Sequence, residues 1–180
     1  MDLKSFFTEY DENVSAGLNV DPLGLQVVWS VYGQKIFKNK VSSISNDVRN
    51  YTINLFHHYI IKSFIENESF KLSKKVLTEC DEKKDSLSFK RACIVYLENI
   101  FVYSVVELGK SGVETSGVLG ISKARRRWNE SDNNPSIIFS KDPQKSNLLV
   151  RQLLLGVSGR YKTPMIEMGL FDKNYTYSSP

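Results

Sequence analysis

The chain has few of the residues from which metal sites, disulfide frameworks and histidine-based active sites are built. Its 180 residues include two cysteines, Cys80 and Cys93, and two histidines, His57 and His58. Two widely spaced cysteines are too few for a disulfide framework or a zinc site, so we expect reduced thiols and no bound metal. No carboxylate pair, Ser-His-Asp order or metal-ligand spacing stands out, and the sequence predicts neither a catalytic residue nor a cofactor.

Glycine and proline are also scarce. Ten glycines and five prolines argue against a turn-dense all-β sandwich, whereas a hydrophobic content of 41% is sufficient for a real core. Apolar residues recur at helical spacing through most of the chain. We therefore expect a mainly α fold, a single helical domain over residues 1–180 with six to eight helices and at most a minor β element.

The chain lacks a long uninterrupted apolar run. The longest one, residues 92–108, is broken by Glu98, Asn99 and Glu107, which makes it a poor membrane span. Residues 1–10 lack the apolar core of a signal peptide. We therefore expect a cytoplasmic protein without a membrane partner.

Helices are predicted where apolar spacing is bounded by capping residues, proline or glycine. The expected helices span residues 3–10, 22–37, 48–65, 69–80, 89–108, 122–130, 148–155 and 163–170. The helix over 89–108 is the most hydrophobic and is expected to form the centre of the core. The helix over 48–65 is expected to bury a wide apolar stripe made by Tyr51, Leu55, Phe56, Tyr59, Ile60 and Phe64.

Three segments between or after these helices are predicted to be irregular. Residues 109–120 contain four glycines and are expected to form a turn-rich hinge. Residues 135–140 are expected to be a short extended segment, and residues 173–180 a loose tail.

The net charge of +4 is unevenly distributed along the sequence. Residues 1–122 carry 14 basic and 15 acidic side chains, whereas residues 123–162 carry nine basic and three acidic ones. We therefore divide the domain into a near-neutral helical scaffold over residues 1–109 and a basic C-terminal lobe over residues 110–180. The asymmetry predicts a polyanionic or acidic partner for the lobe.

The densest positive charge lies in a short helix that follows Gly117 and Gly120, with Ser122 as its expected cap. Arginine suits phosphate because its planar guanidinium donates paired hydrogen bonds. We expect this helix to contact nucleic acid or a protein partner. Its candidate contact residues are Lys123, Arg125, Arg126, Arg127 and Trp128. Alternatively, the arginines pair with acidic residues of the segment 1–122 or cover the core.

A second basic patch comprises Arg151, Arg160 and Lys162. Gly156, Ser158 and Gly159 between them predict a sharp turn whose amides and neighbouring cations would hold a phosphate ahead of a helix starting at residue 163. The alternative is an ordinary turn with flanking cations, because the spacing of a P-loop is missing.

Arg49, Asn54, His57 and His58 share one predicted helix. Arginine, asparagine and histidine on a helix are the groups that some small helical ribonucleases use, with histidine as general acid or base. The segment is strongly apolar, so the opposing interpretation is that these histidines are packing residues.

Three short stretches of the chain stand out: Asp21–Leu25, Asp47–Tyr51 and Arg151–Lys162. Together these stretches resemble the helical modules of uncharacterised proteins from bacterial anti-phage defence loci. The resemblance implies a subunit or module of a multi-protein defence assembly, and it carries over no catalytic residue.

Together these observations predict a non-catalytic helical subunit of a bacterial multi-protein assembly that contacts nucleic acid or an acidic partner through residues 117–162. Two alternatives stay open. One is a purely structural adaptor between proteins, and the other is a small helical nuclease or toxin that uses Arg49 with His57 or His58.

Overall fold

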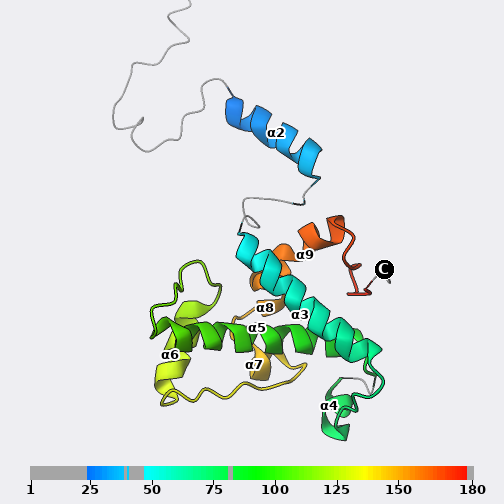
Figure 1. The fold of residues 1–180 in the computed structure, drawn as a ribbon, viewed down its shortest axis with the longest axis vertical. Coiled ribbons are helices and arrows are strands. Elements are labelled where there is room, and N and C mark those ends of the chain that lie inside the picture. The colour runs from blue at the N-terminus through cyan, green and yellow to red at the C-terminus, as the bar shows by residue number, and fades with distance from the viewer. Residues whose placement is uncertain (1–23, 39, 41–46, 81–82, 178–180) are drawn as a thin grey trace, which may run out of the picture. The chain divides into compact units, whose positions relative to one another are not determined.

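A computed structural model describes residues 24–38, 40, 47–80 and 83–177. Over these residues the chain forms eight helices and no strand, which confirms the mainly α prediction (Figure 1). The helices are α2 (Leu25–Phe37), α3 (Val48–Glu66), α4 (Lys74–Glu79), α5 (Leu87–Gly109), α6 (Ile121–Glu130), α7 (Pro143–Ser146), α8 (Gln152–Leu155) and α9 (Val157–Glu167). The predicted helix over 3–10 and the predicted start at Pro22 lie outside the described residues.

The chain divides into two compact units, residues 1–38 and residues 39–180. Within the first unit, α2 carries an apolar stripe at helical spacing whose side chains are all exposed, with Trp29 at 78%. The stripe comprises Leu25, Val28, Trp29, Tyr32 and Ile36.

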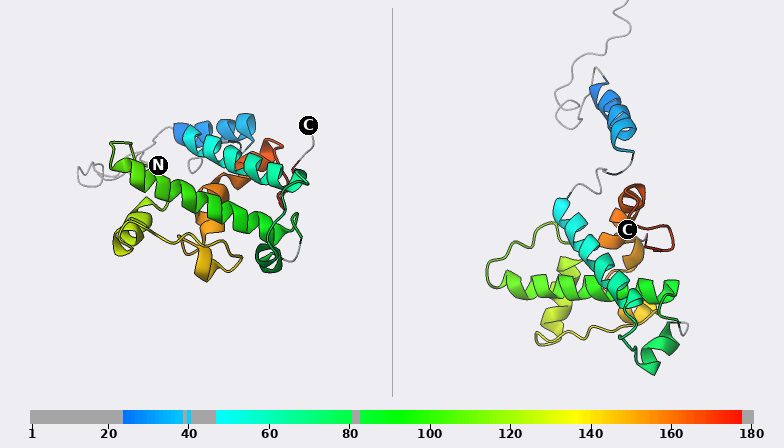
Figure 2. Two further views of the ribbon diagram at one scale, coloured as in Figure 1. Left: turned by 60° about the horizontal axis from the view of Figure 1, so that its bottom comes forward. Right: turned by 45° about the vertical axis from the view of Figure 1, so that its right-hand side comes forward.

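The second unit is organised around α5, which packs against α3, α6, α7 and α8 (Figure 2). Ser86 caps the start of this helix. Its hydroxyl accepts a hydrogen bond from the amide of Phe89 at 3.1 Å, which satisfies one of the free amides of the first turn. Helices from before and after residue 109 thus share one core.

The core consists of three clusters spaced along α5. Towards its C-terminal end, the cluster contains Val102, Tyr103, Val106, Ala124, Trp128 and Leu148. In the middle, it contains Ile94, Ile61, Met165, Phe171 and Tyr175. Near the N-terminal end, it contains Cys80, Phe89 and Ala92. The central position predicted for this helix is therefore correct.

Among the described helices, α5 is the one long and apolar enough to cross a membrane. Half of its most apolar window is buried by the other helices. The core helix of a water-soluble protein passes the same test of length and composition, so the property is weak evidence for a membrane span.

The buried face of α3 differs from the prediction. Leu55, Phe56 and Tyr59, expected in the core, are exposed, whereas Asn54 and His57 are buried. The inner face meets polar atoms of α9: Asn50 donates to the hydroxyl of Tyr161 at 3.3 Å, and Asn54 donates to the sulfur of Met165 at 3.1 Å. Because α3 has a polar and an apolar stripe, spacing alone could not tell which faces inward.

Several boundaries in the last third of the chain also differ. The expected turn at residues 156–159 is the start of α9, which includes Pro164 in its interior. The helix expected over 148–155 is shortened to α8. The side-chain oxygen of Gln152 accepts a hydrogen bond from the amide of Leu148 at 2.7 Å, and Leu148 lies outside the helix. The expected tail is packed as far as Tyr177, and Tyr175 is 2% exposed.

Two further segments differ near the middle of the chain. The helix expected over 69–80 is shortened to α4. Ser73 caps its start, because the Ser73 hydroxyl accepts a hydrogen bond from the amide of Val76 at 3.4 Å. Residues 135–140 pair with no strand among the described residues, where the β structure is one isolated bridge between Phe171 and Tyr177.

Gly156 lies at a close contact between α5 and the start of α9. A Cβ atom at this position would lie 2.4 Å from Oε2 of Glu98 and 2.6 Å from the carbonyl oxygen of Gln152. Its backbone angles, φ −74° and ψ −179°, are open to any residue, so the requirement for glycine is steric.

Gly156→Ala is therefore expected to destabilise residues 39–180 by about 2–3 kcal/mol, because the added methyl group displaces Glu98. Urea unfolding followed by circular dichroism measures the change. Gly33→Ala is the matched control, since apart from its chain neighbours and its own helix backbone no described atom lies within 4 Å of that Cβ position. Equal stability of Gly156→Ala and the wild type would contradict the close approach.

Candidate functional site

The predicted basic helix is present as α6, but Ser122 is not its cap. The helix starts after Gly120, whose φ of 85° lies in the left-handed region that glycine adopts without strain. A Cβ there would lie 3.3 Å from Cδ2 of Leu148. Gly120 therefore turns the chain and also lets α6 approach the segment before α8.

The inner face of α6 is apolar. Ala124 is fully buried, and Trp128, predicted as a contact residue, is only 8% exposed. The ring of Trp128 lies 6.2 Å from that of Tyr103, and Nζ of Lys110 lies 5.3 Å from its centroid. Trp128 therefore anchors and orients the helix instead of offering its ring to a ligand.

The cations of α6 lie on its remaining faces. With Ala124 and Trp128 facing inward, a period of about 3.6 residues places Arg126 outward. Nε of Arg126 lies 3.3 Å from Oε1 of Glu130, and both side chains are exposed, so this pair contributes little to stability. Arg125 and Arg127 lie on the two flanks.

The flanking arginines are held by neutral oxygens. Arg125 donates to the hydroxyl of Thr115, and Nη1 of Arg127 donates to the carbonyl of Asn147 at 3.3 Å. Lys123 is half-buried. Within the described ranges, Glu130 is the one carboxylate within ion-pair distance of these four cations, so pairing with the described acidic residues of the scaffold does not account for them.

The second predicted patch is not a phosphate-binding turn. Residues 156–159 lead into α9, and the amide of Ser158 donates to the carboxyl group of Glu98 at 2.5 Å. Arg151 and Arg160 are exposed. Lys162 donates to the carbonyl of Lys173 at 2.7 Å, and its Nζ lies 4.1 Å from the Tyr175 ring centroid; burial lowers the pKa of its ammonium group.

The structure does not bring the two patches together. The core cluster beneath α6 involves Tyr103, whereas the charge of Arg91 helps to lower the pKa of Lys162 and so lies in its neighbourhood. Along α5 these positions are about 18 Å apart at about 1.5 Å per residue. Figure 2 shows α6 and α9 on different sides of α5, so the cations of α6 and the α9 residues Arg160 and Lys162 belong to two surfaces.

A buried polar network that the sequence-based prediction missed joins α5 to α8 and α9. Glu98 and Asn99 are each 3% exposed. The side-chain amide of Gln152 donates to Glu98 at 3.1 Å and to Asn99 at 2.9 Å, and Asn99 donates to the carbonyl of Ser146 at 2.7 Å. The signal was available, because Glu98 and Asn99 interrupt the longest apolar run of the sequence.

Burial raises the pKa of Glu98 from 4.5 to about 7, although the hydrogen bonds from Ser158 and Gln152 act in the opposite direction. The folded chain therefore binds a proton that the unfolded chain releases between pH 4.5 and about 7. Across this interval the contribution of Glu98 to the free energy of unfolding falls as the pH rises.

The variant Glu98→Gln cannot ionise, so the stability difference between the wild type and the variant should depend on pH. Relative to the variant, the free energy of unfolding of the wild type should fall by about 3 kcal/mol between pH 4.5 and pH 8. Urea unfolding of both proteins at several pH values measures it, and subtraction removes the contribution of other groups. A difference that is independent of pH would show that the Glu98 carboxyl group is not buried in its neutral form.

The structure does not assemble the predicted Arg49 and histidine set. His57 and His58 are 3% and 4% exposed, and burial lowers their pKa values to about 4 and about 3. Nδ1 of His58 lies 3.0 Å from the hydroxyl of Tyr177. Arg49 is exposed and pairs with Asp47 at 3.1 Å. Both imidazoles are thus neutral packing groups at neutral pH.

A groove of about 550 Å³ lies between α3, α5 and the segment 113–118. Asp47, Arg49 and Glu114 are its charged lining residues, and Ile53, Phe56, Phe101, Val105, Val113 and Val118 are its apolar ones. Neither histidine lines it, so the groove does not give these rings access to a substrate.

Across the part of the chain that the structure describes, no three histidine, cysteine or acidic side chains lie close enough together to hold a metal ion. Cys80 and Cys93 do not form a disulfide with each other. No protein-family model, curated protein or solved structure matches the chain. The candidate site therefore depends on the geometry of this chain alone.

Proposed function

We propose that the protein is a non-catalytic helical subunit of a larger protein assembly and that it contacts nucleic acid through α6. The observation that carries the proposal is the orientation of α6. Ala124 and Trp128 fix its apolar face in the core, and its cations lie on the outer face and the flanks.

The chemistry of α6 favours phosphate as the partner group. Arginines 125 and 126 are exposed, and a guanidinium can donate two parallel hydrogen bonds to one phosphate. Lys123 adds charge to the same helix. A rigid helix presents these groups in a fixed arrangement, so little side-chain and backbone order has to be acquired on binding.

The subunit role is supported by apolar surface that the described residues leave uncovered. On α3, Leu55, Phe56 and Tyr59 are 43%, 56% and 68% exposed, and α2 exposes its own apolar stripe. Exposed apolar surface of this kind is typical of protein interfaces. The resemblance to helical modules of bacterial anti-phage defence loci favours the same role.

The variant Lys123→Ala/Arg125→Ala/Arg126→Ala should bind DNA or RNA weakly or not at all. It spares Arg127, whose bond to Asn147 supports the fold. If each lost cation contacts one phosphate, the slope of log K against log salt should fall by about 0.9 per contact for duplex DNA or about 0.7 for single strands. Fluorescence anisotropy with labelled oligonucleotides across salt concentrations measures both effects.

Lys71→Ala/Lys74→Ala/Lys75→Ala is the matched control, because it removes the same charge from exposed positions in and before α4. It should bind like the wild type. Equal weakening of both variants would indicate a nonspecific effect of net charge, and no binding by the wild type would refute the nucleic-acid contact. Binding of an acidic protein through α6 would then be the remaining form of the proposal.

The exposed face of α3 supports a second candidate function, that of a structural adaptor between proteins. Without its partner, such a protein should self-associate through this face as concentration rises.

Sedimentation velocity over a range of concentrations tests the adaptor hypothesis. Phe56→Ser/Tyr59→Ser should reduce self-association, whereas Val150→Ser/Leu154→Ser, at positions 81% and 60% exposed, should not. A wild-type protein that stays monomeric at all concentrations would count against the hypothesis.

A further inference from the structure

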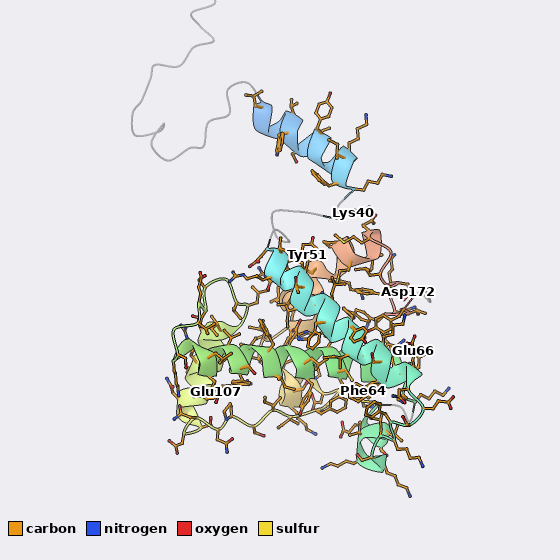
Figure 3. All side chains as sticks on the ribbon, in the orientation of Figure 1. Lys40, Tyr51, Phe64, Glu66, Glu107 and Asp172 are labelled. Atoms are coloured by element: carbon orange, nitrogen blue, oxygen red, sulfur yellow. The ribbon has the colours of Figure 1, made fainter. Side chains whose placement is uncertain are left out.

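The N-terminal half of α5 borders an apolar pocket that the proposed α6 contact does not use. The pocket has a volume of about 410 Å³. It lies where α3, α4 and α5 meet, near Phe64 in Figure 3. Its lining residues are Ile60, Ile61, Phe64, Leu72, Val76, Phe89, Cys93, Tyr96, Leu97 and Phe139.

The lining of this pocket contains no charged side chain. Its polar side-chain groups are the hydroxyl of Tyr96 and the thiol of Cys93. Burial raises the pKa of the Cys93 thiol to about 12, so the sulfur stays protonated and is a poor nucleophile at neutral pH. The pocket therefore suits an uncharged molecule held by non-covalent contacts.

One wall of the pocket is a strap, residues 67–80, which is fixed at both ends. At its beginning, Lys84 donates to the carbonyl of Asn67 at 2.5 Å and to that of Phe70 at 3.2 Å. At its end, the carboxylate of Glu79 accepts from the hydroxyl of Ser140 at 3.2 Å, and Cys80 is fully buried.

Between these two attachments the strap is only partly buried. It contains α4, which has no buried residue. Leu72 and Val76 face the pocket while remaining only half-buried. Leu72 and Val76 pack against the core cluster of Cys80, Phe89 and Ala92 and also line the pocket, so the strap forms one of its walls.

We propose that this pocket binds a neutral small molecule that consists mainly of hydrocarbon, with at most one hydrogen-bonding group to meet Tyr96. The volume lies within the range of about 300–1,000 Å³ of small-molecule sites. Because no lining group supplies a charge, an ionised ligand would lose hydration without compensation. The site is separate from α6, which packs at the other end of α5.

Titration with N-phenyl-1-naphthylamine, an uncharged fluorescent probe, tests the proposal. The wild type should bind it saturably with one site per chain, and 1-decanol should displace it. Val76→Phe fills the pocket and should weaken binding by roughly tenfold or more. Val150→Phe, the same change at a position 81% exposed, should leave binding unchanged.

Cys93→Leu provides a second filling variant from α5, in case Val76→Phe does not fold. Circular dichroism checks that each variant keeps its helical content. The probe could instead bind the outer face of α3, and Phe56→Ser tests that. The proposal is wrong if the wild type shows no saturable binding, if a folded filling variant binds as tightly as the wild type, or if Phe56→Ser alone abolishes binding.

Discussion

The carboxyl group of Glu98, buried at the centre of α5, sets the arrangement of the last third of the chain. It accepts from the backbone of Ser158 and the side chain of Gln152, and Gln152 in turn accepts the amide of Leu148. A buried polar group left without a partner costs about 1–3 kcal/mol, so moving α8 and α9 away from α5 would break several of these hydrogen bonds at a cost in stability. Apolar packing brings these helices onto α5, and the network selects one orientation among those that packing permits.

The second unit is therefore polar in parts of its interior and apolar in parts of its surface. The asparagines and histidines of α3 face inward, and three of its large apolar side chains face outward. Three features lie one after another along α5. The strap and its pocket lie at the N-terminal end, the buried carboxyl group lies in the middle, and the cationic α6 packs towards the C-terminal end. A single long helix thus holds two chemically different surfaces at a fixed distance.

The sequence was sufficient to predict the mainly α class, the central helix and the basic helix, because each depends on local spacing and composition. It was insufficient where tertiary contacts decide. The inner face of α3 depends on Tyr161 and Met165, which lie about one hundred residues later. The interpretation of residues 156–159 as a phosphate-binding turn was wrong, because these residues begin α9 and the backbone amide of Ser158 donates its hydrogen bond to Glu98. Trp128 shows the same limit, since a tryptophan beside arginines suits a contact surface or an anchor equally well.

The contact between Glu98 and Ser158 spans 60 residues of sequence, which has a consequence for synthesis on the ribosome. At about 5–20 residues per second, this stretch takes on the order of 3–12 s to translate. During that interval α5 has emerged with its carboxyl group unpaired and much of its apolar surface uncovered, and the tyrosines that close the core come later still. The order of residues along the chain thus leaves the carboxyl group of Glu98 without its bond to Ser158 until residue 158 has been added.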